Sequence, residues 1–132
     1  MKYLLDTHTW VWWHMHPAKL SRKVKGLIAD PKRHGELLLS AISVWEFCKL
    51  LEKERLGISC DAEEWLATAL SMPKLRLVAL SPPIAYRSTV LPQPFSSDPA
   101  DQIIVATARE ENATILTKDE VMRGYKHVRT LW

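Results

Sequence analysis

The sequence has little cysteine and no long apolar run. Its 132 residues include two cysteines, Cys48 and Cys60, and their spacing matches no metal-binding motif. No signal peptide is visible after Met1, so we interpret both cysteines as free thiols in a reducing cytoplasm. No apolar run approaches the length of a transmembrane helix, and we therefore expect no membrane association. The five histidines also lack the spacing of metal ligands.

Internal repeats, linkers and low-complexity segments are absent as well, which favours one domain over residues 1–132. A hydrophobic fraction of 47% and a charged fraction of 25% are typical of a globular domain with a single core. The formal net charge of +3 permits a polyanionic partner but does not require one.

Strand-like and helix-like segments alternate along the chain. We predict strands at residues 2–5, 36–40, 75–80, 113–116 and 127–131. Helices are predicted at residues 9–15, 18–29, 43–56, 82–90 and 120–125, and two more begin after the caps Asp61 and Asp98. This alternation predicts an α/β fold, with a parallel central sheet that is covered by helices on both faces.

Four acidic residues lie at predicted junctions between strands and helices. Asp6 ends the first strand, and Glu46 lies in the first turn of the helix that follows residues 36–40. Asp101 lies in the first turn of a later helix, and Asp119 follows the strand at 113–116. Ligands of parallel sheets gather at the carboxyl ends of the strands. Carboxylates that meet there repel one another unless a hard cation lies between them, which predicts a Mg²⁺ or Mn²⁺ site for phosphoryl-transfer chemistry.

Apart from Asp6, each acid taken alone also has a structural interpretation, as part of a helix start. The segment from Ser43 to Glu46 matches a capping box, in which Ser43 would cap the helix. Asp98 followed by proline is a good N-cap, and Asp119 would cap the helix at 120–125. Asp6 differs, because no helix start evidently needs it. The recurrence of an acid at four junctions is what favours a shared site.

Four segments carry a resemblance to a known family: LLDTH at 4–8, SAISVWE at 40–46, DPADQIIVATA at 98–108 and LTKD at 116–119. In this order they resemble PIN-domain ribonucleases, and specifically the VapC toxins of bacterial toxin–antitoxin pairs. The resemblance implies a metal-dependent endoribonuclease that forms a homodimer and is silenced by a small antitoxin. It also implies that the metal-binding and catalytic acids are Asp6, Glu46, Asp101 and Asp119.

The implied chemistry is attack on an RNA phosphodiester by a metal-activated water, which leaves a 5′-phosphate and a 3′-hydroxyl. Thr7, Ser43 and Thr117 carry hydroxyls that are placed to bind the acids or the phosphate, although capping explains Ser43 better. Asp98 is either an outer acid of the site or only a cap.

The sequence departs from its relatives beside the third acid. Relatives of this type often have His-Gly before the Asp-Pro pair and arginine after the second aspartate, where this chain has Ser96-Ser97 and Gln102. The loss of a cation beside Asp101 affects substrate handling more than metal binding.

The RNA-binding surface and the reaction both have alternatives. Segment 19–33 is rich in lysine and arginine, and Trp10, Trp12 and Trp13 cluster nearby; these fit an RNA surface, or a solvated helix face over a core. Trp45 lies off the apolar stripe of its helix, which makes it a candidate partner contact.

A non-catalytic RNA-binding or interaction module is the main alternative to the ribonuclease function. A phosphatase of the haloacid dehalogenase type is disfavoured, because His8 occupies the place of its second aspartate.

Overall fold

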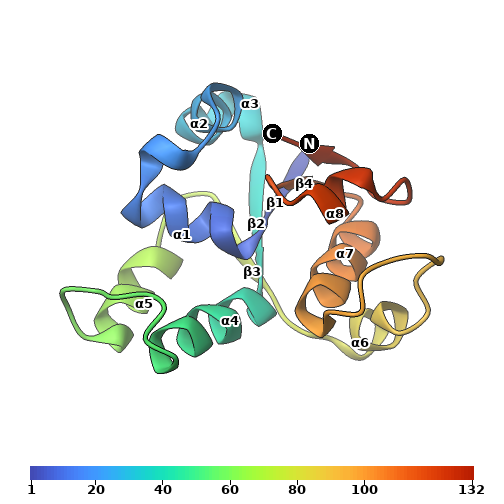
Figure 1. Ribbon diagram of the computed structural model, residues 1–132. Coiled ribbons are helices and arrows are strands. Elements are labelled where there is room, and N and C mark those ends of the chain that lie inside the picture. Colours follow the sequence, from blue (N-terminus) through green and yellow to red (C-terminus); the bar gives the residue numbers. More distant parts are fainter.

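A five-stranded sheet forms the centre of the molecule in the computed structural model, which describes residues 1–132 (Figure 1). All its strands are parallel, in the order β3-β2-β1-β4-β5. Their bounds are β1 (Lys2–Leu5), β2 (Glu36–Ser40), β3 (Leu75–Val78), β4 (Thr114–Leu116) and β5 (Thr130–Leu131). The predicted α/β fold with a parallel sheet is therefore confirmed, and β1 lies in its middle.

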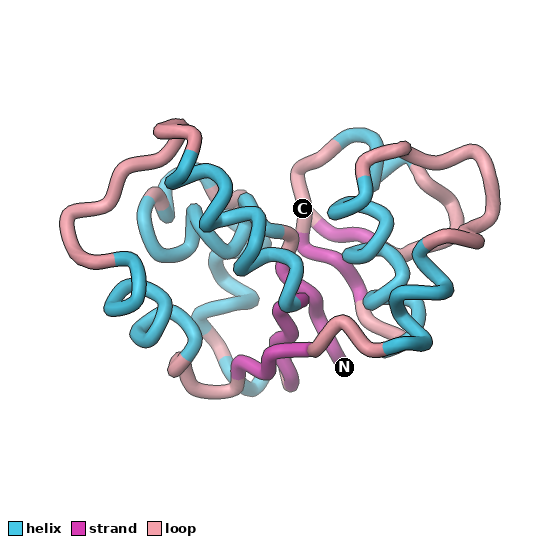
Figure 2. Tube along the Cα trace, turned by 90° about the horizontal axis from the view of Figure 1, so that it is seen from below, coloured by secondary structure: helices cyan, strands magenta, loops and turns pink.

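Helices cover both faces of the sheet, and the strands form a narrow layer between two groups of helices (Figure 2). On one side lie α1 (Thr7–Met15), the 3₁₀ turn η1 (Pro17–Lys19), α2 (Arg22–Ala29), α3 (Pro31–His34) and α5 (Ala62–Leu70). On the other lie α6 (Pro82–Ser88), α7 (Pro99–Glu111) and α8 (Glu120–Gly124). Helix α4 (Ala41–Glu52) contributes side chains to both layers. No helix is long and apolar enough to cross a membrane.

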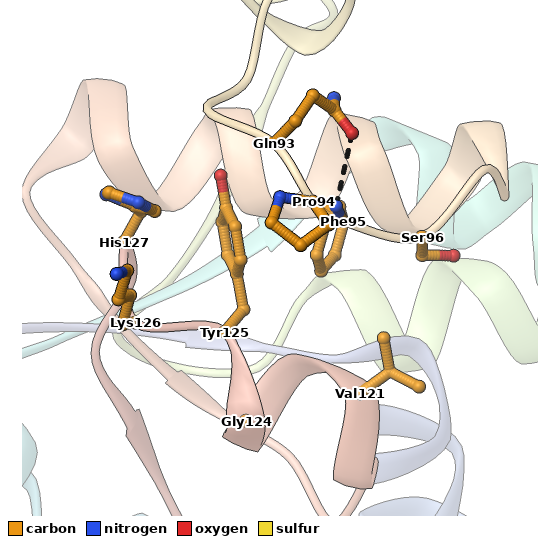
Figure 3. A pocket seen from close by; sticks show the side chains of 9 residues that line it. All are labelled: Gln93, Pro94, Phe95, Ser96, Val121, Gly124, Tyr125, Lys126 and His127. Atoms are coloured by element: carbon orange, nitrogen blue, oxygen red, sulfur yellow. Dashed lines mark hydrogen bonds between the residues drawn. The ribbon is translucent and has the colours of Figure 1, made fainter.

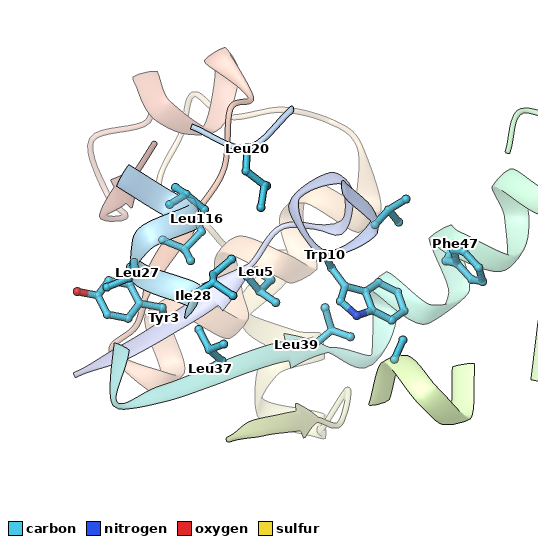
Figure 4. Close-up of a cluster of buried hydrophobic side chains, with 13 residues drawn as sticks. Tyr3, Leu5, Trp10, Leu20, Leu27, Ile28, Leu37, Leu39, Phe47 and Leu116 are labelled. Atoms are coloured by element: carbon cyan, nitrogen blue, oxygen red, sulfur yellow. The ribbon is translucent and has the colours of Figure 1, made fainter. Parts of the chain in front are cut away.

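Each face of the sheet has its own buried core. Successive strand residues point to opposite faces, so Leu5, Leu37 and Leu39 pack against Trp10 and Phe47 (Figure 4). Leu4, Leu38 and Ile115 point the other way, towards Ile104 and Met122. All ten of these side chains are fully buried, and burial of one such group contributes about 1.5–3 kcal/mol. The two cores hold the sheet rigid beneath its carboxyl edge.

Two predicted helix starts were wrong, because other residues cap these helices. Helix α1 begins at Thr7 rather than at residue 9, since Asp6 is its N-cap. The helix predicted at 18–29 is divided: a 3₁₀ turn occupies Pro17–Lys19, and Ser21 caps a new helix at Arg22. Ser21 Oγ accepts a hydrogen bond of 3.1 Å from Val24 N, which fixes that second start.

The predicted capping box at residues 43–46 was also wrong. Strand β2 passes directly into α4 at Ala41, and Ser40 is the N-cap whose Oγ accepts a hydrogen bond from Ile42 N. Ser43 is therefore a buried residue inside the helix, and Glu46 lies in the second turn rather than the first. The two side chains are three residues apart, so they lie on the same face of α4.

The remaining differences shorten elements at their ends. The strand predicted at 75–80 ends at Val78, and the last strand, predicted at 127–131, consists of Thr130–Leu131. The strand at 113–116 begins at Thr114, and the helices at 43–56, 82–90 and 120–125 end at residues 52, 88 and 124. Asp61, Asp98 and Asp119 cap their helices as predicted. Cys48 and Cys60 are exposed and free, as expected.

Candidate active site

Asp6 lies at the centre of the acidic cluster, directly after the middle strand of the sheet. Its side chain is 7% exposed, and both its oxygens have a donor. Oδ1 accepts a hydrogen bond of 2.8 Å from Thr7 N, and Oδ2 accepts one of 2.7 Å from Thr117 Oγ1. The expectation that no helix start needs Asp6 was wrong, because it caps α1. Each oxygen keeps a lone pair for a further ligand.

The hydroxyl of Thr117 joins two of the acids on the β4 side of the site. It donates to Asp6 and also accepts a hydrogen bond of 3.0 Å from Asp119 N. Asp119 in turn caps α8, and its Oδ1 accepts bonds from Val121 N and Met122 N. Since no hydrogen bond reaches Oδ2 of Asp119, this oxygen is free to bind another group.

The hydroxyl of Thr7 orients a third acid on the α4 side. Thr7 Oγ1 donates a hydrogen bond of 2.5 Å to Glu46 Oε1 and lies 2.8 Å from Ser43 Oγ. Ser43 is fully buried and does not cap a helix, so the preferred interpretation of this residue as a cap was wrong. Ser43 supports Thr7, and Thr7 in turn holds Glu46. These contacts extend the hydrogen-bonded chain from Asp119, through Asp6, as far as Glu46.

Asp101 completes the set from the first turn of α7. Asp98 caps this helix, and its Oδ1 accepts a hydrogen bond of 3.0 Å from Asp101 N. The carboxyl of Asp101 itself accepts no hydrogen bond from the protein. Burial, together with the nearby carboxylates of Asp98, Asp6, Asp119 and Glu46, raises the pKa of Asp101 to about 7. The fold therefore brings all four predicted acids, and Asp98, within electrostatic reach of one another.

The acids are not neutralised by ion pairs, although Lys118 lines the hollow beside Asp6 and Asp119. No ion pair of the structure involves Asp6, Glu46, Asp101 or Asp119. Burial raises the pKa of Asp6, against the hydrogen bonds from Thr117 and Thr7. Burial also raises the pKa of Glu46, against the hydrogen bond from Thr7, and the Asp6 and Asp98 carboxylates add to this rise. Clustered carboxylates of this kind are stabilised by a cation from outside the chain.

The donor set fits a hard divalent cation. All its ligand atoms would be carboxylate oxygens, and Asp101, Glu46 Oε2 and Asp119 Oδ2 have no other hydrogen-bond partner. No three side chains of histidine, cysteine, aspartate or glutamate form a group that would hold a metal on their own. Mg²⁺ does not need such a cage, because it keeps several waters and binds one or two carboxylates plus a substrate phosphate. The arrangement suits a metal that shares its coordination with water and substrate.

A hollow of about 390 Å³ gives access to two of the acids. Asp6 and Asp119 line it together with Trp12 and Lys118, among others. Lys118 had no predicted role, although its position beside Asp119 was a signal. Thr9 had no predicted role either; its Oγ1 donates a hydrogen bond of 2.7 Å to Leu116 O and ties α1 to β4. Nothing in the sequence indicates that contact.

The residues that depart from the expected motif contact each other. Gln102 Nε2 donates a hydrogen bond of 2.8 Å to Ser96 O. The bond ties the loop before α7 to the first turn of that helix, where Asp101 lies. A neutral amide thus occupies the position beside Asp101, and it is used to hold the loop.

Comparison with known proteins agrees with this architecture. The family model of the PIN domain matches residues 3–128. Ribonuclease VapC22 of Mycobacterium tuberculosis is 35% identical over 131 residues, which cover 98% of this chain and 97% of that protein. Among solved structures, VapBC2 from Rickettsia felis, bound to a promoter DNA fragment, matches with a TM-score of 0.70 at 19% identity over 99% of this chain and 98% of that one. FitAcB from Neisseria gonorrhoeae matches with a TM-score of 0.68 at 22% identity over 98% of this chain and 96% of that one.

The match to the family model spans nearly the whole chain, and the Mycobacterium relative aligns with it almost from end to end. The two solved structures share its fold. The chain therefore belongs to the PIN-domain family and, within it, to the VapC proteins.

Proposed function

We propose that this protein is a metal-dependent endoribonuclease, and that it acts in the cytoplasm as the toxin of a toxin–antitoxin pair. One observation carries the proposal: four carboxylates converge at the carboxyl end of the sheet without forming an ion pair to any lysine or arginine, and the pKa of Asp101 rises to about 7. Such a cluster binds a hard cation, and cations held this way serve phosphodiester hydrolysis. The related Mycobacterium protein is named as a ribonuclease, which supports RNA as the substrate.

The residues of the site have distinct tasks in this reaction. Asp6, Glu46 and Asp101 would hold one or two Mg²⁺ or Mn²⁺ ions, and Asp119 would bind directly or through water. The metal, when bound, supplies an activated water and shields the charge of the scissile phosphate. Thr117 and the Thr7 backbone fix both oxygens of Asp6. The remaining hydroxyls, those of Thr7 and Ser43, fix Glu46, and Asp98 holds the first turn of α7.

A small antitoxin is the proposed protein partner, and a homodimer is the proposed assembly. Structures with the same fold include VapBC2 from Rickettsia felis, bound to a DNA fragment from its promoter, and a toxin–antitoxin complex from Klebsiella pneumoniae. Helices α1 and α4 pack together beside the acids, and Trp45 on α4 is 55% exposed. These two helices, and Trp45 in particular, form the surface that we assign to the antitoxin.

Cleavage of RNA by the purified chain tests this function. With Mg²⁺ or Mn²⁺ the wild type should cut bacterial RNA and leave 5′-phosphate ends, while chelator should stop the reaction. Asp6→Asn and Asp101→Asn should each remove activity. Asp61→Asn is the matched control, because Asp61 is an exposed N-cap far from the site and asparagine caps helices equally well. A protein that binds RNA but never cleaves it would support the alternative of a non-catalytic module.

A further inference from the structure

The hollow beside Asp6 and Asp119 has an aromatic wall and a free cation. His8 and Trp12 form the wall, with ring centroids 5.8 Å apart and planes tilted by 50°. His8 is exposed and Trp12 is partly exposed, so part of each ring is accessible to a ligand. Lys118 lines the same hollow, is exposed, and takes part in no ion pair.

The same surface continues away from the acids towards the end of the chain. Trp132 lies against Trp12, with ring centroids 6.0 Å apart. It lines a second hollow, of about 490 Å³, together with Lys23 and Arg123. Glu120 lines both hollows and so marks the point where they meet. We call this surface, from Trp12 to Trp132 with both hollows, the tryptophan track.

The cations along the tryptophan track form no ion pair with a carboxylate of the chain. Lys19 Nζ lies 5.6 Å from the centroid of a Trp12 ring. Neither Lys23 nor Arg123 forms an ion pair, and both are exposed. Four positively charged side chains therefore lie along the surface that leads from Asp6 and Asp119 past Trp12 to Trp132. They are those of Lys118, Lys19, Lys23 and Arg123. The only other carboxylate that lines the two hollows is Glu120.

This combination is what a single nucleic acid strand requires. Bases stack on aromatic side chains whatever their sequence, and phosphates bind lysine and arginine. A duplex keeps its bases stacked on one another, so only unpaired nucleotides can place a base on Trp12. A strand on the track would have its next phosphate at Asp6 and Asp119, where the proposed metal chemistry takes place.

A third hollow, away from the tryptophan track, also has aromatic and basic residues, but none of the site acids lines it (Figure 3). It measures about 430 Å³ and includes Phe95, Tyr125, Lys126 and His127. None of the four site acids lines it. Tyr125 is buried, and its hydroxyl donates a hydrogen bond of 2.6 Å to Pro92 O, so this ring serves the fold. A ligand there would not share a wall with the site.

We propose that the tryptophan track binds the single-stranded RNA nucleotides that adjoin the scissile phosphate. Trp12 and His8 stack on a base, while Lys118 and Arg123 bind flanking phosphates. The proposal rests on the function proposed above, since it takes RNA as the substrate. Glu120 repels the RNA backbone at the junction of the two hollows.

Binding of a fluorescent, mixed-sequence single-stranded RNA tests the track. All variants carry Asp101→Asn so that no turnover occurs, and binding is followed by anisotropy over a range of salt concentrations. The double variant Lys118→Gln/Arg123→Gln should lose about tenfold in affinity. The slope of log affinity against log salt concentration should weaken by about 1.4, because two phosphate contacts to a single strand are removed. Lys53→Gln/Arg55→Gln removes the same charges from an exposed segment at the end of α4 and should change affinity less than twofold. Glu120→Gln should bind more tightly than its parent.

A crosslinking experiment locates the bases without relying on a tryptophan variant that fails to fold. RNA that contains 4-thiouridine should crosslink to peptides that contain His8, Trp12 or Trp132. Loss of binding on Lys126→Gln, with no loss on Lys118→Gln/Arg123→Gln, would place the RNA in the other hollow and overturn the track. Crosslinks that map only to α4 and α7 would also overturn it.

Cleavage assays separate this proposal from the proposed function. If the wild type cuts RNA while Lys118→Gln/Arg123→Gln, with Asp101 restored, keeps the same KM, the track is wrong and the nuclease function stands. If RNA binds and crosslinks to the track but is never cut with any divalent metal, the track stands and the nuclease function is wrong. If the RNA neither binds nor is cut, both proposals fall.

Discussion

Thr117 Oγ1 donates a buried hydrogen bond of 2.7 Å to Asp6 Oδ2, although 111 positions separate the two residues in the sequence. The contact exists because β1 and β4 are neighbours in register, with Leu5 opposite Leu116. The residues that follow the two strands are therefore held side by side. Because Thr117 also accepts from Asp119 N, one hydroxyl positions two acids of the candidate site.

Thr117→Val should weaken both the fold and the site. The substitution keeps the shape of the side chain but leaves a buried carboxylate oxygen without its donor, at a cost of about 1–3 kcal/mol in the free energy of unfolding. The pKa of Asp6, which this bond lowers, should rise further. Urea denaturation and RNA cleavage are the measurements. Thr117→Ser keeps the hydroxyl and should restore most of both; equal losses in the two variants would show that the hydrogen bond is unimportant.

Metal should stabilise the folded chain through the acids. A cation that binds only the folded state contributes about 2.7 kcal/mol at one hundred times its dissociation constant, or roughly 10 °C in Tm for a chain of this size. Mg²⁺ or Mn²⁺ should therefore raise Tm in a thermal scan, and chelator should reverse the gain.

The melting temperature of Asp101→Asn should depend on metal much less than that of the wild type. Without metal the variant should melt at the same or a higher temperature, because one of the repelling carboxylates is gone. Most of the rise on addition of metal should be lost. The control Asp61→Asn should keep the full rise. A metal response that is identical in wild type and Asp101→Asn would contradict a role for Asp101 as a ligand.

The stability of the metal-free protein should depend on pH through Asp101. Its pKa rises from 3.8 to about 7 on folding, so between these values the folded chain holds a proton that the unfolded chain has lost. Stability should therefore fall as pH rises from about 4 to about 7, and this contribution should be constant above 7. Urea denaturation in chelator across this range provides the test. The difference between wild type and Asp101→Asn isolates the residue, and a difference that does not vary with pH would contradict the assignment.

Growth arrest should depend on the same acids. The chain, expressed alone in a bacterium, should stop growth, and Asp6→Asn should relieve the arrest because an amide binds hard cations weakly. Circular dichroism of the purified variant should show that the fold is kept, since asparagine is also a good N-cap. A folded Asp6→Asn protein that still arrests growth would contradict the acidic site.

The antitoxin should protect the exposed faces of α1 and α4. Hydrogen exchange in these helices should slow when the partner binds, and Trp45→Ala should weaken the complex without a large loss of stability, because Trp45 is 55% exposed. Helix α6 lies on the other side of the sheet and serves as the internal control. Protection that appears in α6 but not in α1 or α4 would place the partner on the opposite face.

The sequence predicted the elements well because its buried strands are short apolar runs. Leu37 to Leu39 are fully buried in β2, and this apolar run predicted the strand correctly. The caps Asp98 and Asp119 were also predicted correctly, since a cap is a local contact within three residues.

The incorrect predictions concern caps and contacts that depend on how the elements join in the tertiary fold. Ser43 matched a capping box, but Ser40 ends β2 and caps the helix first, which moved Ser43 into the interior beside Thr7. Asp6 was expected to cap nothing because the turn into α1 is immediate and leaves no loop to reveal the start. The assembly of Thr117 with Asp6 depends on strand order, and no local pattern encodes it.

The position of β1 between β2 and β4 determines when the site can form during synthesis. The ribosome makes Asp6 and Glu46 before it makes Thr117 and Asp119. Until β4 has joined the edge of β1, Asp6 lacks both its Thr117 donor and the neighbouring carboxylate of Asp119. A nascent or truncated chain that ends before residue 114 therefore carries Asp6, Glu46 and Asp101, but not the residues that complete the site from the β4 side. The order of the strands delays the finished centre until β4 has been made.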